Sequence, residues 1–152
     1  MNIVPPAVRI LPMNREKEFP QCKNIEDLQQ RFFLDELPSR EDCDYLLYTG
    51  LKSEQGTVIL FQSNRNIIAR AILSSKKRFP RPDSEGYEGS LLFERNSIRI
   101  FDPVPEAEIK KIWTNVKKLS QVKWQLNPEN YITFEGILKN VICPMHKTFL
   151  HK

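Results

Sequence analysis

Two apolar runs joined by a short polar turn constrain the fold of this chain more than any other feature. The runs are TVILFQ and NIIARAIL, both rich in β-branched residues, and the polar residues SNRN join them. This pattern predicts a β-hairpin. The second run leads into a basic segment without acidic residues. The partner of this positive charge is therefore the main question about the function of the chain.

Other segments carry helix and strand patterns around this hairpin. Asn24 is a suitable N-cap for a helix with Leu28, Phe32 and Leu37 on one side. Short strands are predicted in CDYLLYTG and, as a pair around ERNS, in SLLFERNSIRIFDP. Two helices are predicted to follow, in PEAEIKKIWTNVKKL, where Pro105 lies near the first turn, and in LNPENYITFEGILKNVI, where Asn127 is the cap. Their apolar stripes are Ile109, Ile112, Trp113 and Val116 in the first, and Tyr131, Phe134, Leu138 and Val141 in the second.

The order of these elements defines the predicted fold class. Strands cluster in the middle without alternating with helices, which indicates an α+β chain with a mostly antiparallel sheet. About five short strands can close into a small β-barrel, flanked here by an N-terminal helix and two C-terminal helices. We expect one domain over 1–152, divided into an N-terminal extension and helix (1–43), barrel strands (44–104) and C-terminal helices (105–152).

Positive charge is segregated along the chain. Residues 56–82 contain six basic and no acidic residues, and residues 109–128 contain five lysines and no acidic residue. The segments before and between these blocks are acidic, with ten acidic and seven basic residues in 1–55 and seven acidic and two basic residues in 83–108. Such segregation favours a polyanionic partner over two ordinary solvated faces.

No motif for nucleotide binding or acyl transfer is present. The five glycines form no phosphate-binding pattern, no G-x-S-x-G elbow occurs, and His146 and His151 lie at the extreme C-terminus. We therefore expect no cofactor, and a non-enzymatic role is favoured over an enzymatic one.

Cysteine content and the absence of membrane signals favour a cytoplasmic protein. No apolar run approaches the roughly 18 residues of a membrane helix, and the proline-interrupted N-terminal segment is unlike a signal peptide. The odd number of cysteines is typical of a reducing compartment. Cys143 and His146 have zinc-ligand spacing, but Cys22 and Cys43 are isolated, so we predict simple thiols and no metal site.

One pattern would suit a small metal-dependent nuclease. Asp83 follows Pro82, and Glu94 comes eleven residues later, a pair that could hold Mg²⁺ at adjacent strand ends. Asn96 stands where such nucleases need a lysine to position the attacking water. This nuclease is the third hypothesis for the function, and ordinary surface carboxylates are the simpler explanation of the pattern.

The hairpin and the segment after it resemble the PUA-like superfamily, which includes the EVE, ASCH, YTH and SRA domains. GTVILFQSNRNIIARAIL is similar to the central hairpin of that small barrel, with Ala69 and Ala71 as its small positions. IRIFDPVPEAEIKKIW, followed by SQVKWQL, resembles the path of EVE-like chains from a strand through a proline into a helix. The resemblance covers roughly residues 44–138 and singles out no subfamily, since the tryptophan cage of YTH domains and the ASCH signature are both missing.

The resemblance implies recognition of nucleic acid, with a modified or flipped base held at one side of the barrel. Such domains often serve as the specificity part of restriction systems in antiviral defence, which implies a separate nuclease or effector partner. The side chains expected to bind phosphates are Arg65, Lys76, Lys77, Arg78, Arg81, Lys117, Lys118 and Lys123.

We expect the base pocket between the hairpin and the loop that joins the two C-terminal helices. Its predicted residues are Tyr48, Phe61, Ser120, Gln121 and Trp124. Trp124 lies in a polar, basic loop and could stack on a base, and the Gln121 amide both donates and accepts hydrogen bonds. Two alternatives stay open. Trp124 could plug one end of the barrel, and the acidic N-terminal third could instead make the chain a protein-interaction module.

Overall fold

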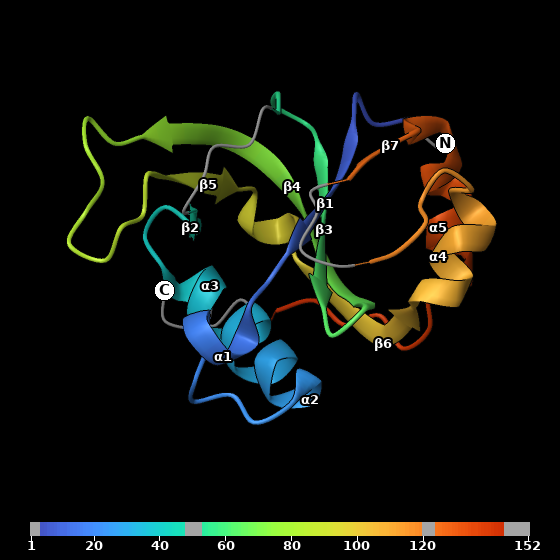
Figure 1. Cartoon of the computed structure of the whole chain (residues 1–152), viewed down its shortest axis with the longest axis horizontal. Helices are drawn as coiled ribbons and strands as arrows, with labels where there is room; N and C mark the ends of the chain where they lie inside the picture. Colours follow the sequence, from blue (N-terminus) through green and yellow to red (C-terminus); the bar gives the residue numbers. More distant parts are fainter. Residues whose placement is uncertain (1–3, 48–52, 120–123, 145–152) are drawn as a thin grey trace, which may run out of the picture.

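A mixed sheet of seven strands forms the centre of the computed structural model, which describes residues 4–47, 53–119 and 124–144 (Figure 1). The strand order is β2-β5-β4-β3-β1-β7, and β6 pairs with β4 outside this path. All pairs are antiparallel except β1 with β3, which is parallel. The strands are β1 (Val8–Pro12), β2 (Asp44–Leu47), β3 (Val58–Ser63), β4 (Asn66–Arg78), β5 (Gly89–Phe93), β6 (Arg99–Pro105) and β7 (Gln125–Leu126).

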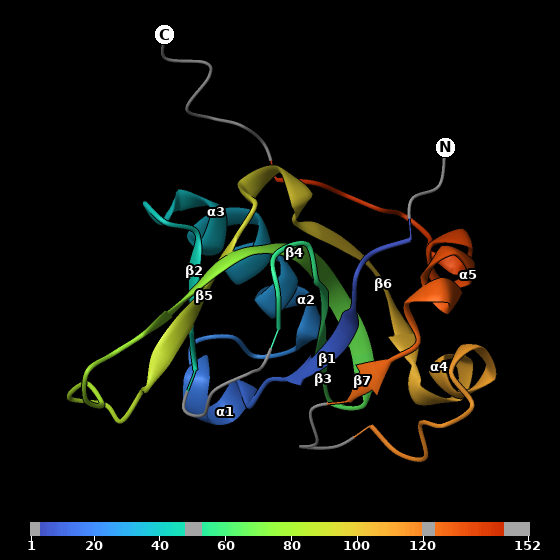
Figure 2. The same ribbon diagram turned by 90° about the horizontal axis from the view of Figure 1, so that it is seen from above.

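Helices cover both faces of the sheet, as Figures 1 and 2 show. The N-terminal group consists of α1 (Arg15–Glu18), α2 (Ile25–Leu28), the π-helix η1 (Gln29–Glu36) and α3 (Leu37–Ser39). The C-terminal group, on the opposite face, consists of α4 (Glu106–Ile112), the 3-10 helix η3 (Pro128–Asn130) and α5 (Tyr131–Ile137). A further 3-10 turn, η2 (Arg95–Ser97), links β5 to β6. No helix in the described ranges is both long and apolar enough to cross a bilayer.

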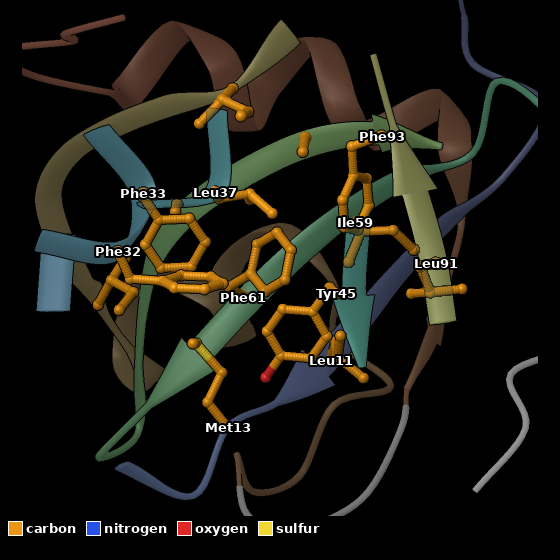
Figure 3. Close-up of a cluster of buried hydrophobic side chains, with 14 of the residues drawn as sticks. Leu11, Met13, Phe32, Phe33, Leu37, Tyr45, Ile59, Phe61, Leu91 and Phe93 are labelled. Atoms are coloured by element: carbon orange, nitrogen blue, oxygen red, sulfur yellow. The ribbon is translucent and has the colours of Figure 1, made fainter. Parts of the chain in front are cut away.

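The apolar run of β3 supplies both layers of the core. Successive side chains of a strand point to opposite faces, so Ile59 and Phe61 pack against the N-terminal helices while Val58 and Leu60 pack against the C-terminal helices. Figure 3 shows the first layer, where the Phe61 ring lies between Phe33 and Tyr45, with ring centroids 4.8 and 5.4 Å away. A strand buried on both faces reads as a continuous apolar run, which VILF is.

The predicted α+β class and mostly antiparallel sheet are confirmed, and the sheet differs from the prediction in its extent and closure. It has seven strands and forms no closed barrel. The expected N-terminal extension contributes β1, which pairs with β3 and extends the sheet beyond the central hairpin to β7. The central hairpin itself is confirmed, with Asn64 and Arg65 both at positive φ in a two-residue turn.

The basic segment after the hairpin is largely strand. β4 continues to Arg78 and pairs with one edge of β5 through Lys76, Lys77 and Arg78, while β2 pairs with the other edge of β5. The connecting residues 79–88 project beyond these strands, and we call this region the arm (Figure 1). Glycine is required at Gly89, where the two strands approach closely, because a Cβ at this position would lie 2.4 Å from the carbonyl oxygen of Lys77. The arm consists of the end of β4, the start of β5 and the connecting residues 79–88.

The predicted helices are shorter than their sequence patterns. Asn24 and Asn127 cap their segments as expected, but α4 ends at Ile112 and α5 ends at Ile137. Beyond α5 the chain turns back and bonds to β6, where the Ile100 and Ile142 backbones form a bridge with 2.9 Å hydrogen bonds. Val141 is consequently 49 % exposed instead of buried on a helical stripe, because the edge of β6 takes the segment out of the helix.

Gln29 joins the N-terminal helices to the sheet through two buried hydrogen bonds. The pairing of β4 with β6 shifts register between Ile67 and Ala69. Nε2 of Gln29 donates to the carbonyl oxygens of Ile68, at 2.9 Å, and of Phe101, at 2.8 Å, on these two strands. A bulge removes regular ladder partners, so one amide satisfies two carbonyls that lie beside the irregularity.

We expect Gln29→Leu to lower the free energy of unfolding by about 2–4 kcal/mol, because it leaves two buried carbonyls without a donor. Gln30→Leu is the matched control, since Gln30 is exposed on the same helix. Urea unfolding followed by tryptophan fluorescence measures both variants. Equal stability of the two variants would contradict the assigned role of Gln29.

Candidate functional site

A pocket of about 70 Å³ lies where α1, η1, β2 and the arm meet. Its apolar wall consists of aromatic rings, and polar groups lie around them. The ring centroids of Phe19 and Phe32 are 4.6 Å apart, and that of Tyr45 lies 5.8 Å from Phe32. The lining residues are Glu18, Phe19, Gln21, Phe32, Glu36, Arg40, Tyr45, Leu46 and Tyr87, and we call this site the Tyr45 pocket.

Tyr45 and Glu18 fix each other in this pocket. The Tyr45 hydroxyl donates to Oε1 of Glu18 at 3.0 Å, and the backbone N–H of Asn14 donates to Oε2 at 2.8 Å. Burial, followed by the nearby Glu18 carboxylate, raises the pKa of Tyr45 well above its ordinary value. Tyr45 therefore keeps its proton and remains a donor, and the Glu18 carboxylate is an oriented acceptor.

Arg40 closes one side of the pocket. Its guanidinium carbon lies 5.2 Å from the centroid of the Phe32 ring, and Nη2 forms an ion pair with Glu36. Nη1 donates to the carbonyl oxygen of Asp44 at 2.6 Å, which ties the guanidinium to the edge of β2. The pocket thus combines aromatic rings, two carboxylates and one guanidinium.

The arm begins beside this pocket. Tyr87 lines the pocket and belongs to the connection between β4 and β5. The backbone N–H of Glu88 donates to the carbonyl oxygen of Leu47 at 2.8 Å, and Leu47 pairs with Gly89. The cations of the arm and the Tyr45 pocket therefore share one edge of the molecule.

The predicted phosphate-binding residues do not form one patch. Lys76, Lys77 and Arg78 are exposed near the outer end of β4, and Arg81 is exposed in the connection that follows. Arg65 lies at the other end of β4, in the turn before Asn66. The 13 residues of β4 span roughly 40 Å, and this length separates Arg65 from the cations of the arm. Lys117 and Lys118 follow α4, which lies on the opposite side of the molecule from the arm (Figures 1 and 2). Lys123 lies outside the described residues.

The second basic block is less positive than its sequence suggests. Lys110 pairs with Glu106 at 3.5 Å, and Lys111 pairs with Glu108 at 2.9 Å, with the glutamates in the first turn of α4 and the lysines in its last turn. By contrast, Lys77 and Arg78 form no ion pair with the described part of the chain. The positive field of the arm is therefore the stronger candidate for contact with phosphates.

The predicted base pocket is only partly described. Phe61 is fully buried in the core, where its ring packs on other rings. Trp124 is half-buried beside the second core layer, and its Nε1 donates to the carbonyl oxygen of Lys118 at 3.1 Å. Trp124 adjoins β7, at the opposite edge of the sheet from β2 and the Tyr45 pocket. Tyr48, Ser120 and Gln121 lie outside the described residues, so that pocket stays a prediction.

The carboxylates of the nuclease hypothesis are separated by a strand. Oδ1 of Asp83 accepts hydrogen bonds from the backbone N–H groups of Glu85 and Tyr87, each at 2.9 Å, and so caps its own turn. Glu94 follows the far end of β5, whose five residues span roughly 16 Å. Among the described residues, no group of three potential metal ligands occurs.

The residues that line the Tyr45 pocket are not among the site residues predicted from the sequence. One sequence pattern could have indicated part of this site. Phe32, Glu36 and Arg40 are spaced four residues apart, a spacing that brings side chains close together along a helix. Phe19, Tyr45 and Tyr87 come from separate segments, and no local pattern brings them together. The prediction that Trp113 belongs to the core is confirmed, since it is 1 % exposed and its Nε1 donates to the Asn127 carbonyl.

The fold is similar to that of solved ASCH structures, and the ASCH domain is among the domains that the central hairpin was predicted to resemble. Three crystal structures of the ASCH protein from Zymomonas mobilis match it: the protein itself, a tyrosine-to-phenylalanine variant and a serine-to-alanine variant. Their TM-scores are 0.53, 0.56 and 0.57, at sequence identities of 10 %, 11 % and 9 %. The matches cover 87 %, 87 % and 90 % of this chain and 96 %, 99 % and 100 % of the other chains. No protein-family model matches the sequence, and no curated protein does.

We expect Tyr45→Phe to lower the stability at neutral pH by about 1 kcal/mol, because the variant loses the hydrogen bond to Glu18. The raised pKa of Tyr45 means that the folded state holds a proton that an unfolded tyrosine loses above about pH 10. The stabilising effect of this tyrosine is therefore complete below pH 10 and declines above it. In urea unfolding, the difference in stability between wild type and variant should stay constant from about pH 8 to pH 10 and narrow above pH 10. A difference that stays constant above pH 10 as well would contradict the coupling of Tyr45 to Glu18.

Proposed function

We propose that this protein binds nucleic acid, with one unpaired base in the Tyr45 pocket and the phosphate backbone along the arm. The observation that supports it best is the shared edge, where an aromatic pocket with hydrogen-bonding groups adjoins Lys77 and Arg78, which are exposed and form no ion pair with the described part of the chain. The Phe32 ring, which is 2 % exposed with the Arg40 guanidinium over it, would provide a stacking surface for a base once that guanidinium moves aside. Glu18, Gln21 and Glu36 would provide donors and acceptors for the edge of the base. Lysine and arginine side chains on the arm would neutralise phosphates.

The PUA-like fold supports the same proposal, because the resemblance implies recognition of a modified or flipped base. A base must leave its stack to enter a pocket of this kind, which favours single-stranded or locally opened nucleic acid. In this role the protein would act in the cytoplasm as the specificity component of a modification-dependent system. A nuclease or another effector would then be a separate partner protein.

Lys77→Gln tests the role of the arm. Each phosphate contact contributes close to one to the slope of the logarithm of affinity against the logarithm of salt concentration. We expect Lys77→Gln to reduce this slope by about one and to weaken all sequences alike, as measured by fluorescence anisotropy. Lys111→Gln is the matched control, since it removes the same charge from a lysine that is paired with Glu108 on the opposite side.

Two results would count against this proposal. An unchanged salt slope in Lys77→Gln would show that this lysine of the arm does not contact a phosphate. Binding that is undetectable for every oligonucleotide at about 50 mM salt, where electrostatic affinity is high, would remove nucleic acid as the partner. Recovery of one protein partner without nucleic acid would then favour a protein-interaction module.

Trp124→Ala distinguishes the Tyr45 pocket from the pocket predicted at Trp124. Loss of a stacked aromatic weakens binding by about 1–3 kcal/mol per base. If the base enters the Tyr45 pocket, we expect Trp124→Ala to leave the affinity for single-stranded oligonucleotides unchanged. A loss of about 1–3 kcal/mol would place the base at Trp124 instead.

A further inference from the structure

The Tyr45 pocket already holds a planar cation, which the chain itself supplies. The guanidinium of Arg40 lies over the Phe32 ring, with its carbon 5.2 Å from the ring centroid, and forms an ion pair with Glu36. A guanidinium spreads its positive charge over a flat group, and both the aromatic face and the carboxylate stabilise that charge. This internal contact shows which chemistry the pocket accommodates.

The charges of the pocket favour such a group. Two carboxylates, Glu18 and Glu36, line it against the single cation Arg40, so one negative charge is in excess. The side chain of Arg40 is 28 % exposed, so it borders on solvent and a ligand could displace it. Displacement of Arg40 by an uncharged ligand would leave Glu36 without its cation, whereas a positively charged ligand would replace that cation.

We infer that the Tyr45 pocket selects nucleobases that carry a delocalised positive charge, as methylation of a ring nitrogen produces in 7-methylguanine. This inference rests on the proposed binding of nucleic acid and names the class of base. The cationic base takes the position of the Arg40 guanidinium on the Phe32 ring and beside Glu36. Departure of the guanidinium also enlarges the pocket, which measures about 70 Å³ with Arg40 in place.

A methylated lysine side chain is the other common ligand of aromatic pockets with carboxylates. The surroundings of this pocket favour the base. Lys77 and Arg78 project from the adjoining arm, where they attract phosphates and repel the basic peptides that carry methylated lysine. The bound guanidinium is also flat, like a base, and unlike a tetrahedral methylammonium group.

The test compares two oligonucleotides that have the same shape and differ in one charge. One contains a single 7-methylguanine, and the other contains 7-methyl-7-deazaguanine, in which carbon replaces the charged nitrogen. We expect the cationic base to bind about tenfold more tightly, a ratio within the range of a partly desolvated cation–π contact. Anisotropy titrations at one salt concentration measure this ratio directly.

Two variants and a control test whether the preference for the cationic base arises in the Tyr45 pocket. Glu36→Gln is expected to remove the tenfold preference, whereas Asp35→Asn, which deletes the same charge one residue away and outside the Tyr45 pocket, is expected to retain it. Arg40→Ala is expected to tighten binding of the cationic oligonucleotide severalfold, because the internal competitor is gone. A thermal unfolding scan of each variant shows that the protein tested is folded.

Several outcomes overturn the inference. Equal affinity for the two oligonucleotides means that the pocket does not select charge, while nucleic-acid binding itself stands. Unchanged or weaker binding by folded Arg40→Ala shows that Arg40 is not a competitor. Tighter binding of a trimethyllysine peptide than of the cationic oligonucleotide assigns the pocket to a protein partner. Failure to bind any oligonucleotide at low salt removes the proposed function itself.

Discussion

The hydrogen bonds of Gln29 hold the candidate site in place. Its amide bridges β4 and β6 beside a shift in their register, and the π-helix η1 begins at this same residue. The wider turn, in which the Leu37 N–H bonds to the Phe32 carbonyl, carries Phe32 and Glu36 toward the Tyr45 pocket. π-Helical turns often occur at functional sites, and here a buried anchor fixes where the turn starts.

Strand β4 runs from the core to the exposed cations of the arm. Its first half is buried between β3 and β6, and its outer end, which is exposed, pairs with β5. The same strand therefore anchors the sheet and positions Lys77 and Arg78 in solvent. The close approach at Gly89 keeps the two strands of the arm together without a side chain between them. Rigid presentation of cations in this way limits the conformational entropy lost on binding.

The charged side chains of the Tyr45 pocket form hydrogen bonds and an ion pair with other groups of the chain. Glu18 is held by Tyr45, Glu36 by Arg40, and Arg40 by the Phe32 ring and the Asp44 carbonyl. Glu18, Glu36 and Arg40 therefore each have a partner within the chain. A ligand must replace the partners that it displaces, and this requirement is the physical source of selectivity.

Those features of the fold that depend only on residues adjacent in the chain could be predicted from the sequence. The β-branched runs around Asn64 and Arg65 specify the hairpin, Asn24 and Asn127 cap their helices, and the basic run after Leu73 provides the cations of the arm. The parallel pairing of β1 with β3, and the meeting of Phe19, Phe32, Tyr45 and Tyr87 in one pocket, depend instead on the tertiary structure. The pairing of β1 and the meeting of these four rings join residues far apart along the chain. Burial of both faces of β3 decides where those segments pack, and no local propensity encodes that choice.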